Sequence, residues 1–313
     1  MHVTALAGGI GAGKFLRGLV RVVAPTGVTV IVNTADDIRM HGLHVSPDVD
    51  SVTYWLGDAF DRERGWGRRD ETFRATEELR RLDADAAWFS LGDLDLATHL
   101  FRTHLLAEGR TLSDVTTRVA ARFGVASRIL PMSDDAVTTR ITAVALGREL
   151  DLHFQEYWVQ RHAQDEVKAV RYEGVERAAP APGVLEAIGS AEAIVICPSN
   201  PVASIGPILA VPGIREAIRA RRERVVGVSG IVGGAPLAGM ADKLMPVAGV
   251  EVTAAGAADC YRGLLAGWVI DEVDRDLGPR IEATGVRVAV TDTIMTDDAK
   301  AEALARTALG VLP

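Results

Sequence analysis

Short apolar segments that alternate with helical stretches constrain the fold of this chain more than any other feature. The segments are almost continuously apolar and rich in β-branched residues, which is typical of strands in a parallel sheet covered on both faces. Between them, apolar residues recur with helical spacing, as at Phe15, Leu16 and Leu19. The pattern therefore predicts an α/β fold built on a doubly wound, mostly parallel sheet. Its predicted strands are His2–Leu6, Val28–Val32, Ala87–Leu91, Ile194–Cys197, Arg224–Val228 and Arg287–Thr291.

The middle of the chain departs from this alternation. Its pattern is mostly helical at first and then becomes short strands, of which Thr138–Val144 and Val167–Tyr172 are the clearest. A stretch rich in alanine and proline at 178–183 is typical of a linker. We predict two units, namely an α/β core made of residues 1–68 and 178–313 and an inserted helical and α+β subdomain made of residues 69–177.

The composition limits the partners that this chain can have. Its 313 residues suffice for roughly two domains or one large α/β domain, and 34 lysines and arginines against 42 acids give a net charge of −8. That sign disfavours an extended nucleic-acid surface. An anionic small molecule is still compatible with it, provided that backbone donors, a few cations or a metal ion hold the molecule locally.

The cysteines and the N-terminus indicate where the protein works. Cys197 and Cys260 form neither a disulfide framework nor a C-x-x-C pair, which indicates a reducing compartment. The segment that starts at Met1 lacks the basic and apolar regions of a signal peptide. Nowhere do about 18 apolar residues follow one another. We therefore expect a cytoplasmic protein without a membrane partner.

The first predicted strand runs into a glycine-rich segment, Gly8-Gly9-Ile10-Gly11-Ala12-Gly13-Lys14, that opens a helical pattern. Such a turn presents backbone N–H groups and the positive end of the helix dipole to an anion. The spacing fits G-x-x-x-x-G-K, but Phe15 stands where a P-loop needs a magnesium-binding Ser or Thr. Lys14 stands where the dinucleotide fingerprint needs its third glycine. We interpret the segment as an anion site of another kind; a turn that serves only tight packing is the alternative.

Acidic residues follow several of the predicted strands. Asn33-Thr34-Ala35-Asp36-Asp37 comes directly after the second strand, and Ser46-Pro47-Asp48-Val49-Asp50 a little later. Because the carboxyl ends of parallel strands meet at one edge of a sheet, these acids should lie close to the glycine-rich segment. Carboxylates and substrate phosphates are the usual ligands of Mg²⁺, so the sequence predicts a magnesium site there. The alternative is that the aspartates only cap helices and turns.

Three later segments extend this theme. Gly92 to His99 and Pro131 to Asp135 again place acids after apolar stretches. Cys197–Pro207 contains three prolines, which fix the backbone so that Ser199 and Asn200 can face a nucleotide. Each segment alone is weak evidence, but together they favour a nucleotide phosphate.

These segments are distributed from one end of the chain to the other, and His153-Phe154-Gln155-Glu156-Tyr157-Trp158 lies between Pro131–Asp135 and Cys197–Pro207. In this combination the sequence resembles the 2-phospho-L-lactate transferase family of coenzyme F420 biosynthesis, which includes bacterial phosphoenolpyruvate-transferring members. The resemblance covers nearly the whole chain. It implies a Rossmann-like, nucleotide-binding sheet and a homodimer.

The resemblance also implies a reaction. The donor would be a guanosine diphosphate ester that carries a phospholactate, phosphoenolpyruvate or phosphoglycerate moiety. The acceptor would be the ribityl hydroxyl of the deazariboflavin Fo, and the products F420-0 or its dehydro form and GMP. Transfer of this kind depends on alignment and charge neutralisation, here by Mg²⁺, more than on a protein nucleophile. The pattern does not distinguish the three acids, which differ by one or two small groups.

The family's site residues carry over by position. The resemblance implies that the nucleotide and its phosphates contact Gly9, Gly11, Gly13, Lys14, Asn33, Thr34, Ser199 and Asn200. It implies that Fo contacts Pro47, Asp50 and Ser90, and that Mg²⁺ is held by Asp36 and Asp50. Asp50 would also be the catalytic residue that orients or deprotonates the attacking hydroxyl.

Two positions depart from the family pattern. Leu94 stands where a basic residue is common, and Gly230 where proline is common. The loss of a cation beside an anionic substrate would change which acid is accepted, weaken its binding or mark a drift in activity.

Two other functions are compatible with parts of the sequence. One is a non-catalytic regulator that binds a nucleotide or nucleotide sugar on the same fold, against which the acidic segments and His153–Trp158 argue. The other is an NAD(P)-dependent oxidoreductase, which the missing third glycine disfavours.

Overall fold

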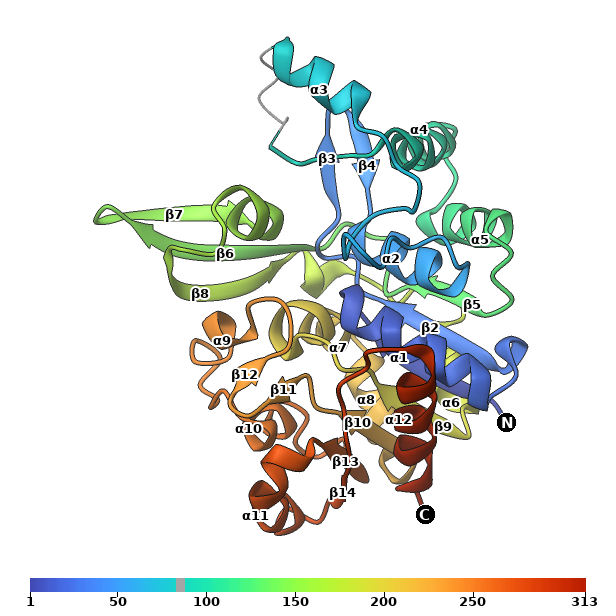
Figure 1. Cartoon of the computed structure of the whole chain (residues 1–313), viewed down its shortest axis with the longest axis vertical. Helices are drawn as coiled ribbons and strands as arrows, with labels where there is room; N and C mark the ends of the chain where they lie inside the picture. Colours follow the sequence, from blue (N-terminus) through green and yellow to red (C-terminus); the bar gives the residue numbers. More distant parts are fainter. Residues whose placement is uncertain (83–87) are drawn as a thin grey trace.

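The main sheet of the computed structural model, which describes residues 1–82 and 88–313, consists of seven strands (Figure 1). They lie in the order β14-β13-β10-β9-β1-β2-β5, and every neighbouring pair runs parallel. In that order the strands are Arg287–Val290, Gly267–Ile270, Val225–Val228, Ala193–Ile196, Val3–Ala7, Val28–Val32 and Arg128–Pro131. The predicted α/β fold with a mostly parallel sheet is therefore confirmed.

Helices connect and cover these strands. Those of the described residues are α1 (Gly9–Val22), α2 (Pro47–Leu56), α3 (Arg74–Arg81), α4 (Asp93–Ala107), α5 (Leu112–Arg122), α6 (Val184–Ser190), α7 (Gly206–Ala210), α8 (Ile214–Arg219), α9 (Ala241–Leu244), α10 (Ala254–Asp259), α11 (Gly278–Glu282) and α12 (Asp298–Gly310). Within that part of the chain, none is both long enough and apolar enough to cross a membrane.

Both faces of the main sheet are buried, which explains its continuously apolar strands. In β1, Val3, Ala5 and Ala7 pack on one face with residues of α1, α2 and α12. Leu6 points to the other face, where it belongs to a cluster with residues of α6, α7 and α8. All of β1 is buried. A strand with solvent on one side would alternate apolar with polar residues instead.

Smaller antiparallel units extend from this core. They are the hairpin of β3 (Ile38–Met40) and β4 (Leu43–Val45), the pair β11 (Ile231–Val232) and β12 (Ala235–Pro236), and a three-stranded arm of β7 (Arg148–His153), β6 (Thr138–Ala145) and β8 (Glu166–Glu173). Figure 1 shows the arm projecting to one side of the molecule and the β3–β4 hairpin beside α4. The strands expected at Thr138–Val144 and Val167–Tyr172 are confirmed as β6 and β8.

One predicted strand is wrong. Trp88–Leu91 forms a turn and an irregular connection, and Ala87 lies outside the described residues. The side chain of Leu91 packs against Met40 and Val45 of the hairpin. A short apolar run can be buried beneath a hairpin as well as within a sheet, and periodicity alone does not separate the two.

The main sheet also contains strands that the sequence pattern assigned elsewhere or did not indicate. β13 is one that no pattern indicated. β5 falls within the segment expected to form the inserted subdomain, yet it pairs with β2 at the edge of the main sheet. The boundaries of that subdomain, at residues 69 and 177, stay a prediction.

Candidate functional site

The strand order reverses its direction between β1 and β9, the position at which a sheet of this kind is expected to form a ligand crevice. From β1 the chain proceeds through β2 to β5 on one side, and it later enters β9 on the other side of β1. In such sheets, ligands bind outside the carboxyl ends of the strands at which this direction reverses. The segments that leave the two strands meet there, because the Ser199 hydroxyl donates to the Gly8 carbonyl at 2.9 Å.

The glycine-rich segment is mostly helical, since α1 already begins at Gly9. Gly9 has a φ of +72°, a conformation that favours glycine and turns the chain from β1 into the helix. A Cβ on Gly11 would overlap the Pro198 carbonyl, and one on Gly13 would overlap the Trp55 indole. Tight packing therefore accounts for both of these glycines. Their contact with a phosphate stays a prediction.

The first turn of α1 nevertheless has the character of an anion site. Its N-cap, Gly8, has no side chain that could accept a hydrogen bond from the helix, and the turn contains no acidic residue. Backbone N–H groups and the positive end of the dipole at such a turn attract phosphate. An acid from another segment reaches this turn, because Asp48 accepts from the Gly9 N–H. The N-terminus of α4 is occupied more fully, because the Glu71 carboxylate accepts from the N–H groups of Leu94 and Asp95 at 2.8 and 2.7 Å. Lys14 is exposed on α1.

Buried acids approach this turn from two other segments. Asp48, in the first turn of α2, lies against Gly8 and Gly9, and its Oδ2 accepts from Asn33 Nδ2 at 2.9 Å. Asp36 follows β2 and is only 4% exposed, and its Oδ1 has no hydrogen-bond partner among the described residues. The expected closeness of acids and glycines is thus present for Asp48, and Asp36 is near enough to Asp48 for the two charges to interact.

Both carboxyl groups have a raised pKa, chiefly because they are buried. Burial raises the pKa of Asp36 well above its ordinary value, and the nearby Asp48 and Asp37 carboxylates raise it further. Burial also raises the pKa of Asp48 to about 7, although hydrogen bonds from the Asn33 side chain and the Gly9 backbone act in the opposite direction. No basic side chain is among the causes that act on either pKa. The pair therefore lacks a neutralising charge from the described part of the chain.

Asp37 connects these acids to the β3–β4 hairpin and the arm. Its Oδ2 accepts from the Ser46 hydroxyl at 2.7 Å and lies 2.9 Å from His44 Nε2. Its backbone carbonyl lies 3.1 Å from His153 Nε2. The Gln155 N–H donates to His153 Nδ1 at 3.0 Å, so the neutral imidazole carries its proton on Nε2, toward Asp37. These contacts fix the turn that holds Asp36.

Asp50 belongs to a different group, between α2 and α4. Both of its carboxylate oxygens accept from the Arg102 guanidinium, with Nη1 3.0 Å from Oδ2. His99 Nδ1 lies 3.2 Å from the same Nη1, and His99 Nε2 lies 3.5 Å from Asp95 Oδ2. The Tyr54 hydroxyl donates to Asp95 at 2.5 Å. Ligand atoms of Asp50, Asp95 and His99 lie within 4.8 Å of one another, as in a metal site, but Arg102 already neutralises Asp50.

The other predicted site residues differ in how free their polar groups are. Thr34 is buried, and its hydroxyl has no partner among the described residues. Asn200 uses its Oδ1 to cap the helical turn that begins at Pro201. The Ser90 hydroxyl accepts from Arg80 at 2.8 Å near the surface, and Pro47 is the first residue of α2. Their substrate contacts stay predictions.

Sequence reasoning missed Asp48 and Arg102 as site residues. Asp48 and Asp50 are two residues apart on a helix, so their side chains point about 200° apart around its axis. Asp48 therefore reaches α1, whereas Asp50 reaches α4. The helical pattern after Pro47 could have indicated from the sequence that Asp48 and Asp50 point in different directions. Arg102 lies 52 positions from Asp50 in the sequence, and no local pattern reveals that contact.

The two positions expected to depart from the family pattern, Leu94 and Gly230, lie in different parts of the structure. Leu94, in the first turn of α4, is 39% exposed, and its carbonyl accepts from Arg68 Nη1 at 2.7 Å. A cation from another segment is therefore present beside Leu94. A Cβ on Gly230 would make only ordinary contacts with Pro198 and Ser199.

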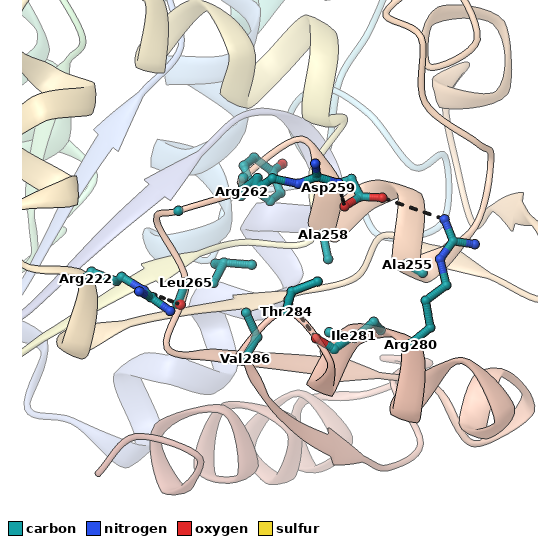
Figure 2. A pocket seen from close by; sticks show the side chains of 12 residues that line it. Arg222, Ala255, Ala258, Asp259, Arg262, Leu265, Arg280, Ile281, Thr284 and Val286 are labelled. Carbon is teal, nitrogen blue, oxygen red and sulfur yellow. Dashed lines mark hydrogen bonds and ion pairs between the residues drawn. The ribbon is translucent and has the colours of Figure 1, made fainter.

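A hollow of about 360 Å³ lies at the opposite end of the sheet (Figure 2). Arg222, Arg262 and Arg280 line it, but each already has a partner. Arg262 pairs with Asp259, Arg280 with Glu251, and Arg222 Nε donates to the Leu265 carbonyl. Since the lining residues precede β10, β13 and β14, the hollow lies away from the carboxyl edge. The crevice between β1 and β9 is thus the better candidate site.

Comparison with protein families and curated sequences gives consistent results. A family model described as 2-phospho-L-lactate transferase CofD matches residues 3–307. The phosphoenolpyruvate transferase of Streptomyces griseus is 51% identical over 310 residues, which cover 99% of this chain and 98% of that protein. The 2-phospho-L-lactate transferase of Methanosarcina mazei is 40% identical over 299 residues and covers 96% of each chain.

The fold is similar to solved structures as well. A crystal structure of a UPF0052 family protein from Bacillus halodurans superposes with a TM-score of 0.62 over 98% of both chains. Its sequence is only 19% identical, so this likeness supports the fold alone.

Proposed function

Because the chain belongs to the 2-phospho-L-lactate transferase CofD family of coenzyme F420 biosynthesis, we propose that it transfers a phospho-three-carbon-acid moiety from a guanosine diphosphate ester to the deazariboflavin Fo. The ribityl hydroxyl of Fo attacks the phosphorus that bears the acid. The bond from this phosphorus to the bridging oxygen breaks, and GMP leaves with that oxygen. The product is F420-0 or its dehydro form, and the hydroxyl proton passes to a base.

One observation carries this proposal: the glycine-rich first turn of α1, whose N-cap Gly8 has no capping side chain, lies beside the buried carboxyl group of Asp48, and Asp36 is buried near Asp48, at the edge of the sheet where ligands bind. The turn attracts phosphate, whereas the acids repel it. Phosphate and carboxylates can share this site if a divalent cation lies between them. That is the combination that a magnesium-dependent phosphoryl transferase requires.

The residues present fit Mg²⁺. Asp36 has a buried carboxylate oxygen without a partner, and Asp48 has no basic residue beside it. We propose that Asp36 and Asp48 hold the ion. Asp50, the partner implied by the family resemblance, has both oxygens bound to Arg102, which leaves it less free for this role. When bound, the ion would stabilise the negative charge on the phosphates of the donor and on the departing GMP.

On the acceptor side we retain Pro47, Asp50 and Ser90 as contacts of Fo. Asp50 lies on the side of α2 that faces α4, away from the glycine turn. It would orient the ribityl hydroxyl or take its proton. Asp50→Asn tests this role, and unchanged turnover of that variant at saturating Mg²⁺ would remove it.

For the donor we propose the enolpyruvate ester. The relative at 51% identity is named a phosphoenolpyruvate transferase, and the relative named for phospholactate is more distant, at 40%. An endpoint assay decides the matter: purified protein, Mg²⁺, Fo and the guanosine diphosphate esters of phosphoenolpyruvate, phospholactate and phosphoglycerate in separate reactions. Mass spectrometry distinguishes the three phosphodiesters and detects GMP. No product with any donor would contradict the transferase proposal.

We also propose a cytoplasmic homodimer. Both cysteines are free thiols, as expected in a reducing compartment. Leu100 and Phe101 of α4 are 57% and 39% exposed, and an exposed apolar pair is suited to a subunit contact. Light scattering coupled to size-exclusion chromatography checks the dimer, and a mass of one chain at micromolar concentration would contradict it.

A further inference from the structure

Arg102 is a cation that the interior encloses almost completely. It is 1% exposed and ranks among the largest fully buried side chains of the described residues. Both of its terminal nitrogens donate to Asp50, and Nη1 also lies 3.4 Å from the His44 carbonyl. A buried charge is tolerated only when it is paired and hydrogen-bonded. Arg102 therefore has a fixed position that ties α4 to α2 and to the β3–β4 hairpin.

The surroundings of Arg102 are acidic. Asp50 and Asp37 both contribute to its electrostatic environment, and its charge acts on Asp95 as well. The pKa of Asp95 stays below its ordinary value, although burial acts to raise it, because His99, Tyr54 and Arg102 stabilise the carboxylate. The charge of this one arginine thus acts on carboxylates from three segments, namely α2, α4 and the turn after β2.

A metal ion bound by Asp50, Asp95 and His99 would also explain this cluster, but the hydrogen bonds that Arg102 donates argue against a metal site. Arg102 Nη1 donates to His99 Nδ1, so the neutral imidazole carries its proton on Nε2, which faces Asp95. Neither nitrogen then offers a lone pair to a metal. A second cation would also have to displace the bidentate bond between Arg102 and Asp50.

We propose that Arg102 is a positioning residue for the acceptor side of the reaction. By holding the Asp50 carboxylate and joining α2 to α4, it fixes the two segments that carry the Fo contacts Pro47, Asp50 and Ser90. Ser90 lies just before α4, so a shift of that helix relative to α2 would change the shape of the acceptor pocket. The inference rests on the proposed function and adds the residue that aligns its acceptor.

Arg102→Lys is the principal test. Lysine keeps the charge but cannot form the bidentate bond. We expect the KM for Fo to rise about tenfold, whereas the KM for the donor should stay within about twofold, because the predicted donor contacts lie on α1 and in the segments that follow β2 and β9. Arg171→Lys is the matched control. Arg171 forms a bidentate pair with Asp151 on the exposed arm, so its replacement should change neither KM.

A second variant keeps the inference testable if Arg102→Lys does not fold. His99→Leu preserves the Arg102–Asp50 bond but removes the acceptor that orients Nη1, and we expect a KM for Fo raised about threefold. Circular dichroism and the melting temperature verify folding. An unchanged KM for Fo in every folded variant, or an equal rise in both KM values, would overturn the inference.

A binding titration separates this inference from the proposed function. The fluorescence of the deazaflavin ring reports the Kd of Fo without any turnover. If the wild type binds Fo but forms no product, the proposed function fails, and the Kd of Arg102→Lys alone decides the inference. An unchanged Kd, or a wild type that does not bind Fo, would overturn it.

Discussion

Two groups of acids lie beside α2, and among the described residues only one of them contains its own cation. Asp50 and Asp95 share a group with Arg102, which binds both oxygens of Asp50. Asp36 and Asp48 have no basic partner in the part of the chain that the structure describes, and the pKa of each is raised. We call the group of Asp50, Asp95 and Arg102 the balanced group, and that of Asp36 and Asp48 the unbalanced group. The balanced group stabilises the fold and holds its shape. An unbalanced group destabilises the fold until a ligand cation arrives, which is the usual character of a functional site.

The largest expected effect comes from breaking the balanced group. Arg102→Met leaves the Asp50 carboxylate buried without a cation, which should lower the free energy of unfolding by about 3–5 kcal/mol. Urea denaturation followed by circular dichroism measures this loss. Arg171→Met, in the exposed pair with Asp151, should cost about 1 kcal/mol or less. Equal losses in the two variants would mean that Arg102 is no more important than a surface arginine.

The second effect concerns the unbalanced group. Asp36→Asn removes a proposed magnesium ligand, so kcat should fall about 100-fold at fixed Mg²⁺. Stability of the magnesium-free protein should not fall, because the substitution removes a buried charge that lacks a partner. Steady-state kinetics measure the change in kcat, and thermal melts measure the stability of the magnesium-free protein. Asp276→Asn, at an exposed acid, is the control. Full activity of Asp36→Asn would contradict the assignment.

The third effect is a pH dependence of the magnesium-free protein. The pKa of Asp48 is about 7 in the folded chain against 3.8 for the ordinary carboxyl group. The folded state therefore binds a proton more tightly, and stability should decrease as the pH rises from about 4 to about 7. Asp48→Asn removes this dependence, so at pH 8 it should be more stable than the wild type by about 1–2 kcal/mol.

The response of the melting temperature to Mg²⁺ tests the same assignment of Asp48. At pH 8, Mg²⁺ should raise the melting temperature of the wild type, because it binds the folded state only. The increase should be smaller at pH 5.5, where protons compete for Asp48, and smallest in Asp48→Asn. An equal increase in both proteins at both pH values would show that the ion binds elsewhere.

The smallest expected effect tests whether the two groups are independent. Tyr54→Phe removes the hydroxyl that donates to Asp95, which should lower stability by about 1 kcal/mol. The response of the melting temperature to Mg²⁺ should not change, since Tyr54 belongs to the balanced group. A lost magnesium response would mean that the groups act as one site.

The sequence by itself determined the fold class and the family, and it predicted the general place of the site. Continuously apolar strands require burial on both faces, which indicates the fold class. The loops that follow parallel strands lie at one edge of the sheet, so the sequence predicted that Gly8, Asn33 and Ser199 lie close together. The predicted strand Ala87–Leu91 is wrong over Trp88–Leu91, because a short apolar run is also compatible with packing beneath the β3–β4 hairpin.

Only the tertiary structure decided what each acid contacts. Asp48 and Asp50 look equivalent in the sequence, but the helical turn between them directs one to the glycine segment and the other to α4. The partner of Asp50 is Arg102, and nothing local in the sequence links the two. Charge balance in a buried site depends on such long-range contacts. Short-range patterns determine the elements of this protein, and the packing of α2 between α1 and α4 determines which of its acids remain free for a cation.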